Sequence, residues 1–540
     1  MAITIVKPVS HHGRRARRNR RAHSRTAGAP VAPVAFIIRA ASIAALSFSS
    51  PALAAEWRIA PTLELRQTFT DNVRLAPAGA ERSDSITELS PGFSVTGTGP
   101  GLKFRGRYAF QYLHYARDAK EDSSFHKLDA TTNLELIKNL FAFDGAASIG
   151  QQNISLLGPQ AFDNYAVTGN RTTVRTVSAS PYLHHHFRGF ASTELRYTHT
   201  GVETSSETLS SSSTDGLRLT VSSDPAFRNL GWGFSYDHQK TRPAENTPVD
   251  STVATASLRY MAIPQLYLTA TLGYDKYDYA AASGAAEPEG SFYSAGFSWR
   301  PTERTSLAIS AGERFYGKTY SLSSSVRSRA SLWNLSYDES ITTSTSEFTL
   351  AATTSTAEFL NQLFRPSIPD DALRQQAVER FILNTGLQPT LSRSVNYLSN
   401  QFFLQKALRA SVAITGAKNT LMFTAYNLDR RPQSAGGAAV LFPGTLTGGI
   451  GDTRQTGLNA LWNWRIGTRT NATLTADFSK SRLNSTGTDD RTRTYRIAFA
   501  HRIQPRLDGV IEMKHTEQNS DTFANNYQEN AISAFLSMKF

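Results

Sequence analysis

Few residues of this chain have the types and spacing that could do chemistry. The sharpest candidate is His184-His185-His186, because His184 and His186 project from the same face of a strand, where two imidazoles can hold a metal ion. The cluster lies beside a turn and has no carboxylate close by in sequence. This favours the alternative, an aromatic role at a membrane interface, and we predict no metal site.

Signatures of catalysis are missing from the sequence. It contains no Gly-x-Ser-x-Gly elbow, no His-Glu-x-x-His and no glycine-rich phosphate loop with a lysine. The absence of cysteine excludes thiolate ligands, cysteine nucleophiles and disulfides. Scattered Ser, His and Asp residues are expected in any chain of this size. We therefore predict no catalytic residue and no cofactor, and a hydrolase is the least favoured of three functional hypotheses.

The charge balance argues against a nucleic-acid partner. The formal net charge is +13, but nine of the 57 basic residues lie in 1–55, a segment that has no acidic residue. The rest of the chain carries 48 basic and 44 acidic residues, and these are dispersed. A nucleic-acid surface would instead gather its cations into a patch.

Residues 1–55 are predicted to be a signal peptide. An arginine-rich start is followed by an apolar stretch, Ala40 to Phe48, and by Ala52-Leu53-Ala54, a small-x-small cleavage site. The mature chain is then expected to begin at Ala55 or Glu56. No run of 18 apolar residues follows, so the sequence predicts no transmembrane helix.

The last ten residues have the pattern of a strand with one apolar face. Every second side chain is apolar, and the set ends on an aromatic residue: Ile532, Ala534, Leu536, Met538 and Phe540. This alternation is typical of the closing strand of an outer-membrane barrel. It also resembles the C-terminal signal that the outer-membrane assembly machinery recognises, and it should pair with the strand that begins at Trp57.

The same alternation recurs along 56–540, in segments longer than the strands of most soluble sheets. Tight turns such as Gly99-Pro100 and Gln504-Pro505 alternate with longer polar connections. We predict an all-β fold, a single antiparallel transmembrane barrel of about 22 strands, with 20 as the alternative. The count depends on 325–353, where a turn at Tyr337-Asp338-Glu339-Ser340 would make Ile341 to Thr353 a separate strand.

Charged side chains on the strand face opposite the apolar columns are expected to line the lumen, because charges that face lipid are costly. The candidates are Arg66, Lys103, Arg105, Arg107, Glu135, Arg196, Arg218, Arg259, Arg409, Arg465, Asp477, Arg496, Glu512 and Lys514. A barrel of about 22 strands is too wide for side chains alone to fill, which predicts a hydrated polar interior. Arginine is in excess among the candidates, which favours anionic solutes. Because alternation begins at Trp57, no plug domain is expected before the first strand.

A helical insert interrupts the strand pattern at 354–392. Ser355-Thr356-Ala357-Glu358 has the form of a capping box, and Pro369-Asp370 begins a second helical pattern that ends near Gly386. Strand parity places the insert on the outer side. It could cap the barrel or fold into the lumen, and an ordered surface loop is the favoured interpretation.

Short motifs resemble those of the outer-membrane β-barrel proteins associated with PEP-CTERM/exosortase systems. The motifs are Thr70-Asp71-Asn72-Val73, Leu75-Ala76-Pro77, Ile86-Thr87-Glu88-Leu89-Ser90-Pro91-Gly92, Gln151-Gln152-Asn153-Ile154-Ser155, Val167-Thr168-Gly169-Asn170-Arg171-Thr172, Ser180-Pro181-Tyr182-Leu183, Asn396-Tyr397-Leu398 and Phe403-Leu404-Gln405-Lys406. The resemblance implies the outer membrane of a Gram-negative bacterium and a link to exopolysaccharide production and protein sorting. It implies no catalytic residues.

These observations lead to one favoured function and one main alternative. We expect a passive channel or export conduit, with exopolysaccharide or its fragments as the transported class. The alternative is a structural or docking protein that binds surface proteins through the outer loops and the insert. Under both hypotheses the partners include outer-membrane lipid and the assembly machinery, and no nucleic acid.

Overall fold

The computed structural model describes residues 55–205, 211–243, 248–279, 287–343, 356–365, 402–434, 452–522 and 525–540, with the single positions 368, 374, 377, 378, 381 and 382. The predicted signal peptide up to residue 54, Ser355, Pro369, Gly386 and Asn396-Tyr397-Leu398 therefore lie outside the described residues. So does most of the predicted strand Ile341 to Thr353, from residue 344 onward.

The described chain consists almost entirely of β-strands. They are β1 Glu56–Thr70, β2 Asp84–Gly99, β3 Leu102–Tyr115, β4 Ser123–Ile137, β5 Phe141–Asn153, β6 Arg171–Phe187, β7 Ala191–Thr204, β8 Ser212–Ser223, β9 Leu230–Pro243, β10 Val249–Ile263, β11 Leu266–Asp278, β12 Glu289–Thr302, β13 Thr305–Arg314, β14 Gly317–Arg327, β15 Ser331–Thr343, β16 Phe402–Thr415, β17 Asn419–Pro432, β18 Thr453–Arg465, β19 Thr470–Leu483, β20 Thr488–Gln504, β21 Leu507–Ser520 and β22 Tyr527–Lys539. The described helices are the short 3-10 helix η1, Ala119–Glu121, and α3, Thr356–Phe364.

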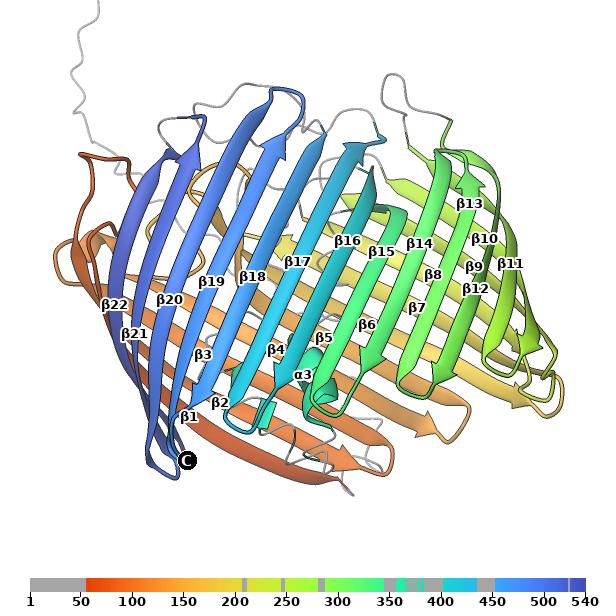
Figure 1. Cartoon of the computed structure of the whole chain (residues 1–540), viewed down its shortest axis with the longest axis horizontal. Helices are drawn as coiled ribbons and strands as arrows, with labels where there is room; N and C mark the ends of the chain where they lie inside the picture. Colours follow the sequence, from red (N-terminus) through yellow and green to blue (C-terminus); the bar gives the residue numbers. More distant parts are fainter. Residues whose placement is uncertain are drawn as a thin grey trace, which may run out of the picture. The chain divides into compact units, whose positions relative to one another are not determined.

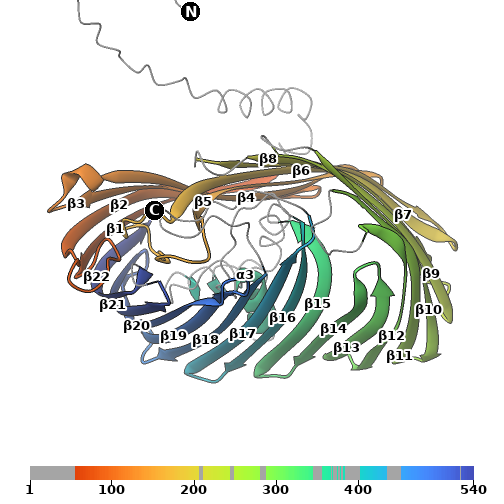
Figure 2. The ribbon, with the colours of Figure 1, turned by 90° about the horizontal axis from the view of Figure 1, so that it is seen from above.

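The sheet closes on itself to form a barrel (Figures 1 and 2). Each strand pairs antiparallel with its neighbours in sequence, and β1 pairs with β22 from Thr62 opposite Lys539 to Thr70 opposite Ala531. The backbone N–H of Phe540 extends this seam by donating to the carbonyl oxygen of Pro61 at 3.0 Å. The predicted antiparallel barrel of 22 strands is confirmed, and its last strand pairs with its first as expected.

The outer face of the barrel is a belt of exposed apolar side chains. On β1 these are Leu63, Leu65 and Phe69, and on β22 they include Ile532 and Leu536, whereas the alternate residues of both strands turn inward. In a closed sheet the backbone N–H and C=O groups of every strand have hydrogen-bond partners, and an apolar outer face suits contact with lipid. The protein is therefore an outer-membrane β-barrel of a Gram-negative bacterium. Among the described residues, no helix is long and apolar enough to cross a membrane.

The connections at the two ends of the barrel differ in length. At the end that carries Phe540 they are tight turns, for example between Gly99 and Leu102 and between Gln504 and Leu507. At the other end most are longer, and the longest runs from Thr343 to Phe402. Barrels of this class have short periplasmic turns and longer outer loops, so the C-terminal end is the periplasmic end.

The predicted turn at Tyr337-Asp338-Glu339-Ser340 is wrong. These residues lie inside β15, where they pair with Leu408 to Gln405 of β16. The real turn falls earlier, between Arg327 of β14 and Ser331 of β15. There Ser328 makes the tight connection with its own hydroxyl, which accepts from the backbone N–H of Ser331 at 2.9 Å. A serine turn of this kind carries no glycine or proline to announce it.

Candidate functional site: the lumen and its two inserted segments

An apolar row crosses the inner wall of the barrel on four adjacent strands. Leu332 of β15 pairs with Ala413 of β16, Ala413 with Met422 of β17, and Met422 with Leu461 of β18. All four are buried, with exposed fractions of at most 2%. The flanking residues Trp333, Phe423 and Trp462 are exposed on the outer face, so the row itself faces the lumen.

Helix α3 packs on this row, inside the ring of strands (Figure 2). We name the row of Leu332, Ala413, Met422 and Leu461 the seat of α3. Phe359, Leu360 and Leu363 share one helix face and are buried against the row. A second helical segment follows, of which Val378 and Phe381 belong to the same cluster. The rings of Phe364 and Phe381 meet edge to face at 5.6 Å between centroids. The apolar positions that predicted two helices are therefore the positions that bury them.

A buried arginine joins the two helical segments. Arg374, 4% exposed, donates from Nε to Oδ1 of Asn361 on α3 at 2.6 Å. It also donates from Nη1 to the carbonyl oxygen of Ile368 in the connection at 2.8 Å. A planar guanidinium that spans a helix and the following turn restrains both, so the two segments are held together as one body.

The described part of the insert thus lies in the lumen, and for this part the favoured expectation of an ordered surface loop is wrong. Leu332 is the second residue of β15 after the periplasmic turn, and Ala413 lies two residues before the end of β16. Strand β15 ends at the outer end of the barrel, whereas α3 packs against the wall near the periplasmic end. Its apolar helix face needs burial, and the row supplies an apolar surface on the inner wall.

A basic cavity lies beside α3 near the periplasmic turns, with a volume of about 470 Å³. Arg300 at the end of β12, Arg304 in the following turn and Arg327 at the end of β14 line it, together with one carboxylate, Glu303, and with Gln362 of α3 and Leu332 of the seat. Within the described part of the chain, the three guanidinium groups form no ion pair with a carboxylate. The cavity can therefore accept anionic groups.

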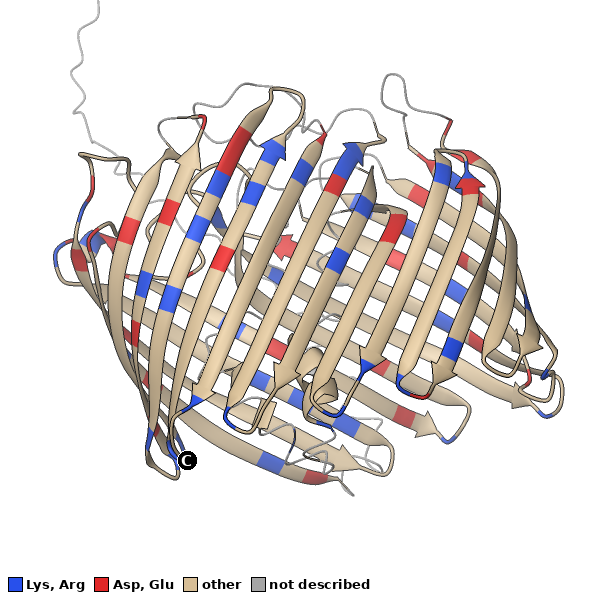
Figure 3. Ribbon diagram, in the orientation of Figure 1, with Lys and Arg blue, Asp and Glu red and all other residues tan. Residues whose placement is uncertain are grey.

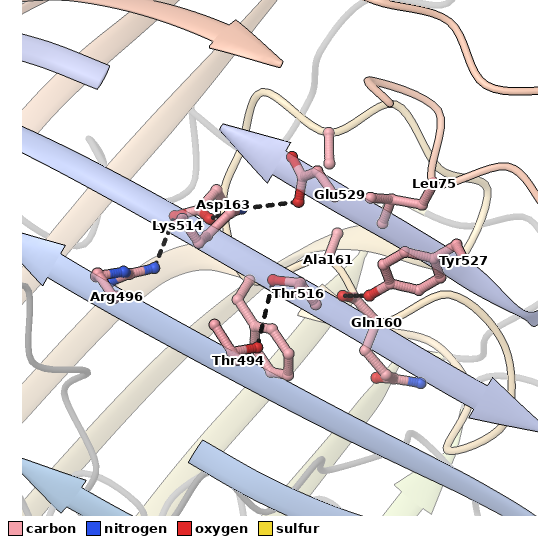
Figure 4. Close-up of a pocket in the computed structure, with 12 residues that line it drawn as sticks. Leu75, Gln160, Ala161, Asp163, Thr494, Arg496, Lys514, Thr516, Tyr527 and Glu529 are labelled. Carbon is pink, nitrogen blue, oxygen red and sulfur yellow. Dashed lines mark hydrogen bonds and ion pairs between the residues drawn. The ribbon is translucent and has the colours of Figure 1, made fainter. Parts of the chain in front are cut away.

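A second segment, the β5–β6 loop of residues 154–170, folds onto the inner wall of β20, β21 and β22 (Figure 4). The N–H of Gly158 donates to Oδ2 of Asp490 at 2.9 Å, and Nε2 of Gln518 donates to the carbonyl oxygen of Gly158 at 2.9 Å. The hydroxyl of Tyr527 donates to the carbonyl oxygen of Gln160 at 3.1 Å. These hydrogen bonds take the place of water for the N–H and C=O groups of the buried loop backbone.

Ion pairs latch the same loop to the wall. Lys514 of β21 contacts Asp163 of the loop at 2.7 Å and Glu529 of β22 at 3.0 Å (Figure 4). Arg496 of β20 lies 3.7 Å from Asp163. Tyr165 completes the cluster, because its hydroxyl donates to Glu529 at 2.9 Å and its ring lies 4.7 Å from the Lys514 ammonium. The side chains of Lys514 and Arg496 are less than a tenth exposed, so this latch is largely shielded from solvent.

The latch shifts the pKa values of two side chains in the loop, Asp163 and Tyr165. Burial alone would raise the pKa of the Asp163 carboxyl, but the cations of Lys514 and Arg496 outweigh it and hold the pKa well below its usual range. Burial raises the pKa of the Tyr165 hydroxyl, with Glu529 acting in the same direction and Lys514 against it. The loop is therefore held as an ionised Asp163 beside a neutral Tyr165 across the physiological range.

Four of the charged candidates meet near this latch. Arg496 contacts Glu512 at 3.5 Å, and Lys514 is the next inward residue on β21. Arg66 of β1 pairs with Glu64 at 2.9 Å, and its guanidinium lies 4.2 Å from the ring centroid of Phe535, an inward residue of the seam strand.

The remaining charged candidates are spread around the barrel. Each lies on the strand face that alternates with exposed apolar residues: Lys103, Arg105 and Arg107 on β3, Glu135 on β4, Arg196 on β7, Arg218 on β8, Arg259 on β10, Arg409 on β16, Arg465 on β18 and Asp477 on β19. Several have local partners. Arg196 contacts Asp144 at 2.7 Å and Arg409 contacts Asp338 at 3.3 Å. The structure brings these residues to no common site.

The assembly candidates follow the outer face of the seam strand. Ile532, Leu536 and Phe540 are about half exposed, and Ala534 and Met538 lie between them on the same alternation.

The histidine cluster is split between the two faces of β6. His186 contacts Asp224 at 3.1 Å and Ser192 at 2.9 Å, whereas the ring of His185 meets Phe187 edge to face at 4.4 Å between centroids. Across the described ranges, no three His, Asp or Glu residues are grouped so that they could hold a metal ion.

Sequence reasoning did not single out the seat of α3 or the loop latch. The seat has a signal, since Leu332, Met422 and Leu461 are apolar at positions where the alternation calls for polar residues. The latch has none, because Asp163 and Lys514 are 351 residues apart and only closure of the barrel brings them together.

Comparison with known proteins finds only distant likenesses to this chain. No protein-family model matches the chain, and no curated protein matches it. Among solved structures, the chain is similar to the siderophore receptor PirA from Pseudomonas aeruginosa, with 9% identity, 89% of this chain and 80% of that chain covered, and a TM-score of 0.45. It is also similar to the FrpB iron transporter from Neisseria meningitidis, F3-3 variant, with 10% identity, 89% and 81% covered, and a TM-score of 0.46.

Proposed function

We propose that the protein is an outer-membrane conduit for hydrophilic anionic solutes, with the insert 354–392 as its gate. The observation that carries the proposal is the position of α3. A helix from an outer loop lies inside the barrel and packs against Leu332, Ala413, Met422 and Leu461. A segment that is not part of the wall can leave it without breaking a strand pairing, which is what a gate requires.

The charges of the lumen support an anionic solute. Lys103 and Arg105 form an exposed inward column on β3, and Arg300, Arg304 and Arg327 line the cavity beside the gate. Guanidinium groups match the geometry of carboxylate and phosphate groups. Because the sequence resembles barrels of exosortase systems, we propose acidic exopolysaccharide or its fragments as the class of solute.

In this mechanism the wall residues do no covalent chemistry. When the insert leaves its seat, the polar wall hydrates the lumen and solutes pass by diffusion. The basic groups raise the local concentration of anions and lower that of cations at the periplasmic mouth. Return of the apolar helix face to the seat closes the path.

Conductance in planar bilayers tests the proposal. We compare the full mature chain with a variant in which 356–382 is replaced by a glycine-serine linker. We expect low or intermittent conductance from the full chain and a larger, steady conductance from the variant, with a reversal potential that indicates anion preference. A folded deletion variant, identified by heat-modifiable migration in gels, that remains sealed would overturn the gated conduit.

A second comparison addresses the selectivity. Joint replacement of Arg300, Arg304 and Arg327 by Gln should reduce the anion preference of the deletion variant. The matched control is Lys318→Gln, which removes a cation from the outer face of β14 and should leave the preference unchanged. Under the alternative that the protein is a docking protein of the cell surface, deletion of the insert would abolish retention of a surface partner without changing conductance.

A further inference from the structure

A cluster of cations lies on the outer face of the barrel, outside the lumen. It comprises Arg431 of β17, Arg454 of β18, Lys480 and Arg482 of β19, and Arg491 and Arg493 of β20, which we name the outer basic patch. In Figure 3, bands of Lys and Arg cross these strands near their upper ends, which carry the long connections. Lys480 and Arg482 continue the alternation of Leu474 and Phe478, and these two apolar residues are exposed on the outer face. The patch therefore faces away from the lumen.

The patch begins where the apolar belt ends. On β20, going toward the outer end, the outward residues change from Ile497 and Tyr495, both more than 40% exposed, to Arg493 and Arg491. Charges that face lipid cost about 2–4 kcal/mol near the bilayer midplane and about 0–1 kcal/mol near the interface. This change from apolar to basic residues therefore places the patch at the headgroup level of the outer leaflet.

The register sets like charges directly opposite one another. Arg454 of β18 pairs with Arg482 of β19, and Lys480 of β19 pairs with Arg491 of β20. Like charges in opposed positions of neighbouring strands destabilise a sheet. Two such pairs on adjacent strands are therefore a cost to the sheet, and an anionic group held between the strands reduces it.

Carboxylates neutralise the patch only in part. Asp489 is shared by three cations, Lys480 at 2.8 Å, Arg491 at 3.5 Å and Arg482 at 3.8 Å. Asp429 is shared by two, Arg454 at 2.6 Å and Arg431 at 3.5 Å. Arg431 also reaches Asp452 at 4.0 Å, and Arg493 contacts Glu517 at 3.6 Å.

The cations of the patch outnumber the carboxylates that they contact, and their side chains stay 41–60% exposed. One further acid, Asp521, lies at the edge, where its carboxylate accepts from the backbone N–H of Asp489. The outward ion pairs on the opposite side of the barrel are more balanced. There Arg242 and His199 share Asp215, and Lys276 pairs with Glu289.

Aromatic rings lie directly below the cations. Phe478 and Tyr495 meet edge to face at 5.8 Å between centroids, and Tyr495 stacks on His515 at 6.4 Å. Phe478 is paired with Arg493 across β19 and β20. A ligand that bridges the two levels must be anionic at its head and apolar below it.

We propose that the outer basic patch binds the phosphate groups of a phosphorylated glycolipid in the outer leaflet, with its acyl chains on Phe478 and Tyr495. Arginine pairs matched to phosphate oxygens give bidentate contacts, and the half-exposed guanidinium groups still have free N–H edges. The occupant is a lipid rather than a free anion, because the patch is continuous with the lipid-facing belt. The site is independent of the gate and of the proposed conduit.

Native mass spectrometry of the purified barrel tests this site with diphosphoryl lipid A as the probe. We expect the wild-type barrel to retain the lipid. The variant with Lys480→Gln, Arg482→Gln and Arg491→Gln should bind it roughly a hundredfold more weakly, the order expected when three cations are removed next to an anionic lipid. The matched control is Arg242→Gln with Lys276→Gln, which removes outward cations elsewhere and should leave binding unchanged.

Two further arms separate the site from its alternatives. Asp489→Asn frees three cations at once and should tighten binding, a gain that misfolding cannot produce. Dephosphorylated lipid A should bind no better to wild type than to the triple variant, and millimolar inorganic phosphate should not displace the lipid. Equal binding of lipid A to wild type and triple variant, or displacement by inorganic phosphate, would overturn the proposal.

Discussion

The seat of α3 gives a prediction with a magnitude. Leu360 is fully buried in the cluster formed by the helix and the inner wall. Replacing it with Ala removes its contacts and leaves a cavity, which costs about 2–5 kcal/mol at a well-packed site. That loss weakens docking of the insert while the strand pairings stay intact. The ratio of undocked to docked insert should therefore rise by about 30-fold to several thousand-fold.

The absence of cysteine makes a direct assay possible. Ala413 lies in the seat and is fully buried, so a thiol introduced by Ala413→Cys is accessible only when the helix leaves. The rate at which a water-soluble thiol reagent labels this position should rise in the Leu360→Ala background by the same factor as the undocked population. Open probability in planar bilayers should rise with it.

A matched substitution separates docking from general destabilisation. Leu335→Ala also truncates a leucine, but on the outer face of β15, where Leu335 is 37% exposed and lies outside the cluster that holds Leu360. It should change neither labelling nor open probability. The reasoning fails if Leu360→Ala leaves both unchanged in a folded barrel, or if Leu335→Ala raises them equally.

Four further predictions concern the latch and the seam. Because the folded-state pKa of Asp163 is depressed, its contribution to latch stability is present above the ordinary Asp pKa of about 3.9 and is lost as pH falls through the lower folded value, so proteolysis of the 154–170 loop should be no faster at pH 5 than at pH 7. Lys514→Met should leave the carboxylates of Asp163 and Glu529 without their shared cation and cost about 3–5 kcal/mol, seen as a lower midpoint of thermal unfolding; an unchanged midpoint would count against a buried latch. Asn72→Ala should cost about 1–3 kcal/mol in the same measurement, because the Asn72 amide donates to two carbonyl oxygens and accepts from the N–H of Ala76. An unchanged midpoint of thermal unfolding in this variant would show that these hydrogen bonds do not stabilise the barrel. Deletion of Phe540 should lower the amount of assembled barrel in outer-membrane fractions more than any single lumen substitution does, whereas normal surface levels would refute its role in assembly.

The strands were predictable because the membrane imposes a period of two on every one of them. Leu63, Leu65 and Phe69 have to face lipid, so their spacing in the sequence reports the direction of each side chain. Turns were predictable only where glycine, proline or asparagine marks them. The β4–β5 turn has Asn139 at φ +56°, which asparagine tolerates, whereas the β14–β15 turn depends on a serine hydroxyl and escaped detection.

The insert was predictable as helices but not in position. Phe359, Leu360 and Leu363 specify an apolar helix face, and this face could be covered by a partner, by the loop itself or by the wall. Only the register of four strands shows that Leu332, Ala413, Met422 and Leu461 form a row that matches it. No local property of any one of these residues distinguishes a seat from a stray apolar side chain.

The two inserted segments have different mechanical consequences because they lie on different parts of the wall. The seam between β1 and β22 spans nine residue pairs, fewer than the fifteen between β1 and β2, so it is the weakest closure of the sheet that involves β1. The 154–170 loop strengthens this seam. Tyr165 donates to Glu529 of β22, and Thr70 of β1 donates to the same carboxylate at 3.1 Å.

The β1–β2 loop reinforces the same closure. The N–H of Asp71 donates to the carbonyl oxygen of Asn530 at 3.1 Å, and the N–H of Val167 in the 154–170 loop donates to the carbonyl oxygen of Val73 at 2.8 Å. Releasing the latch would therefore loosen the barrel as well as open space in the lumen. The insert that carries α3 rests on β15 to β18, away from the seam, and its departure breaks no contact that closes the sheet. A segment that moves during transport has to be separable from closure of the barrel, and this separation favours α3, rather than the loop, as the gate.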